Sequence, residues 1–201
     1  AKETQPSISF DGQTLYFASD RGNSSRKLDI YRSQRQEDGS WGKPENLGKP
    51  INTDQTEQSP FIHADNKTLF FSSQGHMGMG SSDLFYARRK ANGEFGEPQN
   101  LGYPINTKGE DIGLFVSSDG RTAYFASRKP EQGEGRLDLY RFQLPEKARA
   151  QAVTYLEGKI EDAITRQNLQ AQVRIRDLSS GEVMVRTRSA KGTGRFMLPL
   201  H

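Results

Sequence analysis

The sequence predicts an all-β protein, in which three four-stranded repeats form a partial β-propeller and a small β-sandwich follows them. The first observation is a segment at 60–73 that recurs at 6–19 and at 114–127, with equivalent residues 54 positions apart. A period of about fifty residues, rich in short strands, is typical of propellers and related arrays. The second observation is that this period ends near residue 145, where a different strand pattern begins.

Each repeat divides into four strands, named A to D in chain order. Strand A leads into an Asp-Gly or Asp-Asn turn, which indicates a hairpin because Gly and Asn adopt positive φ at low cost. Strand B carries aromatic residues on both faces, as suits a sheet covered on two sides. A variable loop precedes strand C, and a Gly-centred turn leads to a short edge strand D. The expected ranges are 7–10, 60–63 and 113–116 for strand A; 14–19, 68–73 and 122–127 for strand B; 29–33, 83–88 and 138–142 for strand C; 41–47 and 95–101 for strand D.

The third repeat is expected to have no strand D, because Leu144-Pro145 comes two residues after the end of its strand C. Three blades are too few to close a propeller, which typically has about four to eight. Either further blades precede Ala1 or the three form an open arc, and we favour further blades. We therefore expect the chain to be a piece of a longer protein.

The segment 145–152 reads as a polar connector that few contacts should cross. Beyond it, strands are expected at 153–161, 171–177, 183–189 and 195–200, with apolar residues such as Val173 and Ile175 alternating with Arg. This pattern indicates a small β-sandwich with one wet face. The predicted division is 1–146 for the propeller repeats and 147–201 for the sandwich.

Composition excludes several function classes. The net charge is +3, with 28 basic and 25 acidic residues mixed along the chain, whereas a nucleic-acid-binding protein would show a basic stripe. There is no cysteine, so disulfides and thiolate chemistry are excluded. No apolar run approaches the roughly twenty residues that a transmembrane helix needs.

Two stretches resemble known families. The segment 9–19, followed by Leu28-Asp29-Ile30-Tyr31, resembles the TolB-type (WD40-like) propeller repeat. The segment 155–162, with 169–173 and Gly194-Arg195-Phe196, resembles the carboxypeptidase regulatory-like (transthyretin-like) domain, apart from Asn168-Leu169 where Pro-Leu is common. The two in this order resemble the middle of OmpA-family envelope proteins, including the PorE-type component of the type IX secretion machinery.

That resemblance implies a non-catalytic scaffold in the periplasm or at the outer membrane, whose partners are other envelope proteins. It also implies helical repeats upstream and a peptidoglycan-binding domain downstream, so peptidoglycan would be reached only through a domain outside this chain. A carbohydrate-binding or peptidase-accessory module is the alternative. An aromatic platform on the propeller loops would favour sugar, and the sequence places its aromatic residues in strands instead.

Residues that recur in every repeat are expected to be structural. A carboxylate at the start of strand C can accept backbone N–H groups of the preceding turn, and one in the A–B turn can do the same. The aromatic residue of strand B is expected to pack between blades. These structural positions are Asp11, Asp65, Asp119, Asp29, Asp83, Asp138, Phe17, Phe71 and Phe125.

The sequence indicates neither an enzyme nor a cofactor site. It has no Gly-x-Ser-x-Gly elbow, and no two of its three histidines have metal-ligand spacing. The segment Gly75-His76-Met77-Gly78-Met79-Gly80 could be compared with a phosphate-binding loop, but strand C follows it where such a loop needs a helix. A flexible loop is the better interpretation.

In a four-stranded meander, the B–C loops and the D-to-A connectors emerge at the same end of the blade. That end carries the residues that differ between repeats: Arg21, Arg26, Lys27, His76, Met77, Met79, Arg128, Lys129 and Arg136. Basic loops around two methionines could bind a partner protein or an anionic glycan. Solvated loop tips are an equally good interpretation.

Overall fold

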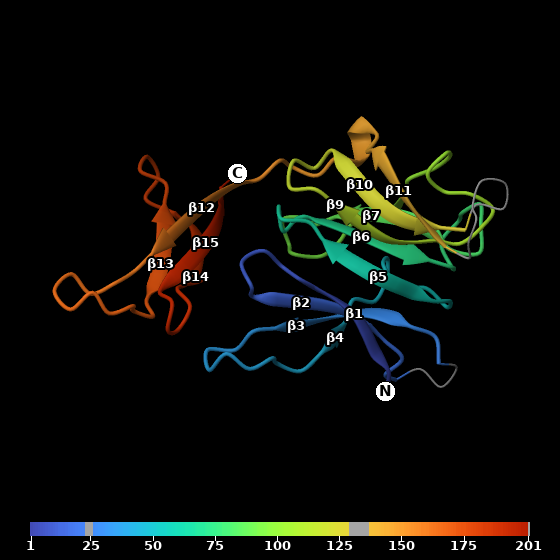
Figure 1. The fold of residues 1–201 in the computed structure, drawn as a ribbon. Coiled ribbons are helices and arrows are strands. Elements are labelled where there is room, and N and C mark those ends of the chain that lie inside the picture. The colour runs from blue at the N-terminus through green and yellow to red at the C-terminus, as the bar shows by residue number, and fades with distance from the viewer. Residues whose placement is uncertain (23–25, 129–136, 201) are drawn as a thin grey trace.

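A computed structural model describes residues 1–22, 26–128 and 137–200 of the chain. Its three N-terminal sheets are antiparallel and follow one another like the blades of a propeller (Figure 1). Blade 1 consists of β1 (Glu3–Ile8), β2 (Thr14–Ser19), β3 (Asp29–Gln34) and β4 (Glu45–Asn46). Blade 2 consists of β5 (Glu57–Ile62), β6 (Thr68–Ser73), β7 (Asp83–Arg88) and β8 (Gln99–Asn100). In the described residues, blade 3 consists of β9 (Asp111–Val116), β10 (Thr122–Ser127) and β11 (Asp138–Gln143), which agrees with the prediction that it lacks strand D.

The strands labelled A, namely β1, β5 and β9, lie next to one another, with β5 in contact with both of the others. Side chains of one blade bind the backbone of the next there. Gln5 Oε1 accepts the N–H of Ser59 at 2.9 Å, and Ser7 Oγ accepts the N–H of Ile62 at 3.0 Å. These bonds fix the stagger of adjacent blades.

Each strand A begins earlier than the sequence suggested. A β-bulge interrupts the strand, and the sequence pattern recovers only the part after the bulge. The equivalent residues Gln5, Ser59 and Gly113 all have positive φ, at 53°, 50° and 69°. The bulge breaks the alternation of apolar and polar residues, and this is why a pattern of period two recovers only the part of the strand beyond it. Strand B was predicted at its observed bounds in all three blades.

The hydrophobic core lies between the blades. Phe71 is fully buried in a cluster with Tyr16, Ile30 and Ile51 of blade 1. Phe125 is buried in a second cluster, between blades 2 and 3. Phe17 is the exception among the three strand-B aromatics, because it lies on the open flank of blade 1, where its ring stacks on Tyr31.

The segment after β11 does not behave as a linker with few contacts, and that prediction is wrong. It forms a short 3-10 helix, η1 (Glu146–Ala148), and places Leu144, Ala148 and Ala150 in the core between blades 2 and 3. Arg88 donates to the carbonyl of Arg149 at 2.6 Å. The alanines that made this stretch look like a connector are small enough to pack against the backbone of blade 3.

The C-terminal part contains β12 (Thr154–Lys159), β13 (Gln172–Arg176), β14 (Val183–Arg188) and β15 (Arg195–Leu200). They form two antiparallel pairs, β12–β15 and β13–β14, which lie to one side of the blades in Figure 1. Leu198 is fully buried between them, whereas Ile164 and Leu178 are exposed. The Tyr155 ring contacts Phe10 of blade 1, with 4.7 Å between ring centroids. Among the described residues, no helix has the length and apolar character needed to cross a membrane.

Candidate functional site

The loops between strands B and C meet the D-to-A connectors at one end of the blades, as the meander requires. Lys27 Nζ donates to the carbonyl of Asp54 at 2.6 Å, and His76 Nε2 lies 2.8 Å from the carbonyl of Ile51. The N–H of Ser81 donates to the carbonyl of Gly109 at 2.9 Å. We call this end the loop face; it comprises the described residues of 20–28, 48–56, 74–82 and 102–110, together with Arg128.

Two of the predicted loop residues have a shared structural role. The Arg21 guanidinium lies 5.5 Å from the ring centroids of both Phe17 and Tyr31. The His76 ring lies 5.9 Å from Phe71 and 5.3 Å from Phe85. In blades 1 and 2 the start of the loop therefore covers the aromatic pair formed by strands B and C. Arg21 also forms an ion pair with Glu3.

The glycine-rich loop of blade 2 is held in place, which contradicts its interpretation as flexible. Ser73 Oγ accepts the N–H groups of Gly75 and His76 at 3.0 and 3.1 Å. Asp83 Oδ2 accepts those of Met79 and Gly80 at 2.9 and 3.0 Å. Serine and aspartate at the strand ends thus satisfy four backbone donors of a loop whose composition alone suggests mobility.

The exposed part of the loop face is smaller than the sequence suggested, and more apolar. Met77 is 94% exposed and Met79 is 50% exposed. Arg26 is exposed on the corresponding loop of blade 1. Arg128 forms an ion pair with Glu110 at 3.3 Å. Lys129 and Arg136 lie outside the described residues.

Sequence reasoning missed one aromatic residue on this face. Tyr103 lies on the connector between β8 and β9 and is 78% exposed. The expectation that all aromatic residues sit in strands is therefore wrong. Comparison of the repeats could have revealed it. Blade 1 has Lys49 at the position equivalent to Tyr103, and a position that holds a lysine in one repeat is expected to face solvent in the other.

The repeated carboxylates make internal hydrogen bonds. Asp11 and Asp119 each accept the hydroxyl of the serine two residues earlier and the N–H two residues later. Asp29 accepts the Asn46 side chain at 2.9 Å. Asp138 opens β11 at the edge of blade 3.

Asp65 differs from its equivalents because it is buried. It accepts the N–H groups of Lys67 and Thr68, both at 2.9 Å, and that of Gln151 at 3.1 Å. Burial by itself would raise its pKa, but the hydrogen bonds with His63, Lys67 and Thr68 outweigh it and hold the pKa well below its usual range. His63 Nε2 must donate to the carbonyl of Ser117, 3.0 Å away. The pair therefore joins blade 2 to blade 3 and to the segment after η1.

The described residues contain no arrangement typical of catalysis. No group of three or more His, Cys, Asp or Glu side chains among them could hold a metal ion. The buried carboxylates Glu57 and Asp111 each bind a threonine hydroxyl of the preceding connector and a serine hydroxyl of strand B. Because two blades share this arrangement, it ties the connector to the sheet.

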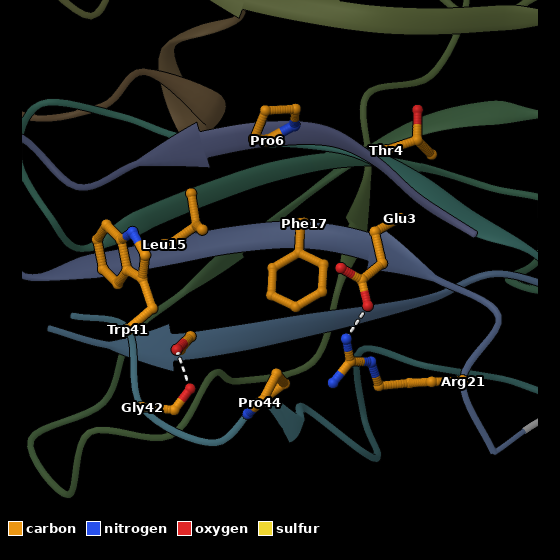
Figure 2. Close-up of a pocket in the computed structure, with 10 residues that line it drawn as sticks. Glu3, Thr4, Pro6, Leu15, Phe17, Arg21, Trp41, Gly42 and Pro44 are labelled. Atoms are coloured by element: carbon orange, nitrogen blue, oxygen red, sulfur yellow. Dashed lines mark hydrogen bonds and ion pairs between the residues drawn. The ribbon is translucent and has the colours of Figure 1, made fainter. Parts of the chain in front are cut away.

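A groove of about 510 Å³ lies on the open flank of blade 1. Figure 2 shows Phe17, Leu15 and Trp41 along its floor, with Arg21 and Glu3 paired at one end. The equivalent residues of blade 2 are Phe71, Leu69 and Phe95, which blade 1 buries. The groove is therefore the side of a blade that a neighbouring blade covers elsewhere in this molecule.

No protein-family model matches the sequence, and no curated protein is similar to it in sequence. Among solved structures, TolB from Acinetobacter baumannii is similar over 70% of this chain and 29% of its own, with a TM-score of 0.50 and 14% identity. A putative TolB from Agrobacterium tumefaciens is similar over 99% of this chain and 58% of its own, with a TM-score of 0.47 and 13% identity. The chain spans less than two thirds of either protein. It is an all-β protein with a TolB-like partial propeller.

Proposed function

We propose that this chain is a non-catalytic interaction module of the cell envelope, which binds a partner protein through the loop face. The observation that carries this proposal is the exposed apolar group of Met77, Met79 and Tyr103 on loops that are themselves hydrogen-bonded in place. Methionine and tyrosine offer large contact area, and a fixed loop loses little conformational entropy on binding.

The proposed role in the envelope is more specific. The chain would belong to an OmpA-family, periplasmic or outer-membrane-associated protein that links an envelope or type IX secretion assembly to peptidoglycan through a domain outside this chain. The support is the order of the two motifs in the sequence and the TolB-like fold of the first. Identification of peptidoglycan-associated proteins in the partner fraction would test it.

The test of the loop face is a triple variant, Met77→Gln, Met79→Gln and Tyr103→Ser, used as bait in an envelope extract and compared with the wild type. We expect the partner to be lost and the melting temperature to stay unchanged, since exposed side chains contribute little to stability. The matched control is Ile164→Gln with Leu178→Gln, which removes equally exposed apolar side chains from the C-terminal part. Loss of the partner with the control alone would place the site there instead.

A carbohydrate-binding module is the second candidate, and exposed Tyr103 favours it, because a sugar ring can stack on an aromatic face. Glycan binding that Tyr103→Ala abolishes and Met77→Gln leaves intact would select this candidate. For both candidates we expect no hydrolysis of peptide, ester or glycoside substrates. Turnover that disappears on substitution of His63 or His76 would contradict the non-catalytic proposal.

A further inference from the structure

Strand C of blades 1 and 2 is completed by the connector that follows strand D. In blade 1 the N–H of Leu47 donates to the carbonyl of Ile30 at 3.0 Å. The Asn52 side chain then binds both backbone groups of Ile30: its Oδ1 accepts the N–H at 2.8 Å and its Nδ2 donates to the carbonyl at 2.9 Å. A single asparagine thus satisfies both backbone groups of Ile30, as a neighbouring strand would.

Blade 2 repeats this arrangement. Leu101 donates to the carbonyl of Leu84 at 3.1 Å, and the Asn106 side chain binds the N–H and the carbonyl of Leu84 at 2.8 and 2.9 Å. A second asparagine, Asn100, accepts the N–H of Gly102 and the side-chain amide of Asn106. The two asparagines belong to one sequence, Asn-Leu-Gly-x-Pro-Ile-Asn, which occurs at 46–52 and at 100–106.

The same connector covers the apolar side chain at this position of strand C. Ile30 and Ile51 are buried in one cluster, with Leu47 packed against it. Leu84, Leu101 and Ile105 are buried in the other. The exposed fraction of both Ile30 and Leu84 is 0%.

Blade 3 presents the same edge without its cover. Leu139 pairs with Ala126 in β10 as Leu84 pairs with Ser72 and Ile30 with Ala18, so the three positions are equivalent. Leu139 is 77% exposed. In the described part of the chain, β11 has a strand neighbour only in β10, and the Asn-Leu-Gly-x-Pro-Ile-Asn sequence has no third copy.

We propose that the edge of β11 is a strand-addition site for an extended segment of a partner protein that carries the Asn-Leu-Gly-x-Pro-Ile-Asn pattern. The leucine N–H and the second asparagine of that segment would bind the carbonyl and N–H of Leu139. Its leucine and isoleucine would cover the Leu139 side chain, and Asp138 stands where Asp29 receives the first asparagine of blade 1. Strand addition draws affinity from main-chain hydrogen bonds and specificity from side-chain contacts. The site is distinct from the loop face and does not depend on the function proposed for it.

The experiment is a fluorescence anisotropy titration of the 201-residue protein into a labelled peptide with the sequence of residues 97–107. We expect saturable binding. Replacing both peptide asparagines by alanine should weaken it at least about tenfold, since several hydrogen bonds are lost. N-methylation of the peptide leucine, which removes only the main-chain donor, should weaken it as well. No binding at millimolar protein, or equal binding of the alanine peptide, would overturn the proposal.

Protein variants locate the site. Leu139→Asp should abolish binding without lowering the melting temperature, because the side chain is exposed. The control Ile164→Asp, on a side chain that is even more exposed, should leave binding intact. If the peptide instead displaces residues 97–107 from blade 2, the Leu139→Asp variant and the wild type will bind it with equal affinity. That result would overturn the proposal. If the peptide binds this chain but not a longer form of the protein, a segment of the protein itself covers the edge of β11. That result would also overturn the proposal of a partner protein.

Discussion

Blade 2 and blade 3 carry nearly the same sequence pattern in different surroundings. Leu84 and Leu139 occupy equivalent positions of strand C, yet Leu84 is inaccessible and Leu139 is mostly exposed. Strands A to C pair in the same order in both blades, but the described part of blade 3 has no strand D. A connector and a neighbouring blade cover strand C of blade 2 and not that of blade 3. A blade of this fold therefore forms its strands locally and obtains most of its stability from what packs on it.

The largest test of this comparison is truncation of the two leucines. Leu84→Ala should lower the free energy of unfolding by about 2–5 kcal/mol, because it leaves a cavity in the core between blades 2 and 3. Leu139→Ala should change it by no more than about 0.5 kcal/mol. Chemical denaturation of both variants gives the two values. Equal losses would mean that the outer side of blade 3 is covered in solution.

The second test compares two equivalent carboxylates, buried Asp65 and exposed Asp119. The depressed pKa of Asp65 means that its ionised form stabilises the folded state above the unfolded pKa of about 3.9, and that this contribution is lost as the pH falls further. Asp65→Asn should therefore cost on the order of 2 kcal/mol at pH 7 and clearly less at pH 3.

Asp119 has a lowered pKa because its carboxylate accepts the Ser117 hydroxyl and the Arg121 N–H, but it is open to solvent. Asp119→Asn should give a smaller loss with the same direction of pH dependence. Denaturant melts of both variants at pH 7 and pH 3 make the measurement. A pH-independent loss at Asp65 would show that its role is packing and not charge.

The smallest expected effect comes from the bulge in strand A. Ser59 and Gly113 share a left-handed conformation, which costs a residue with a Cβ about 1–2 kcal/mol, part of which the greater backbone entropy of glycine offsets. Ser59→Gly should therefore raise stability by about 0.5–1 kcal/mol. Gly113→Ser should lower it by a similar amount, since an added Cβ there meets no atom within 4 Å. If thermal melts show that Ser59→Gly lowers the melting temperature and Gly113→Ser raises it, this interpretation of the bulge is wrong.

The sequence alone determined the repeat and, within each repeat, the bounds of strand B. Strand B and its hairpin turn follow from a local pattern: aromatic residues on both faces, and a turn residue at positive φ such as Asn66, at 54°. The absence of strand D in blade 3 follows equally, because Pro145, three residues after Phe142, cannot continue a ladder. These features depend on a few neighbouring residues, and so the sequence contains them.

Only the tertiary structure decided which side chains are available. Arg21 and His76 look like free loop residues, but rings from two strands lie beneath them. The alanines after β11 look like a linker, but they fill a gap between blades. Tyr103 and Leu139 are exposed because nothing in the described chain reaches them. Burial depends on side chains from other strands, connectors and blades, and a local pattern carries no record of whether such a neighbour is present.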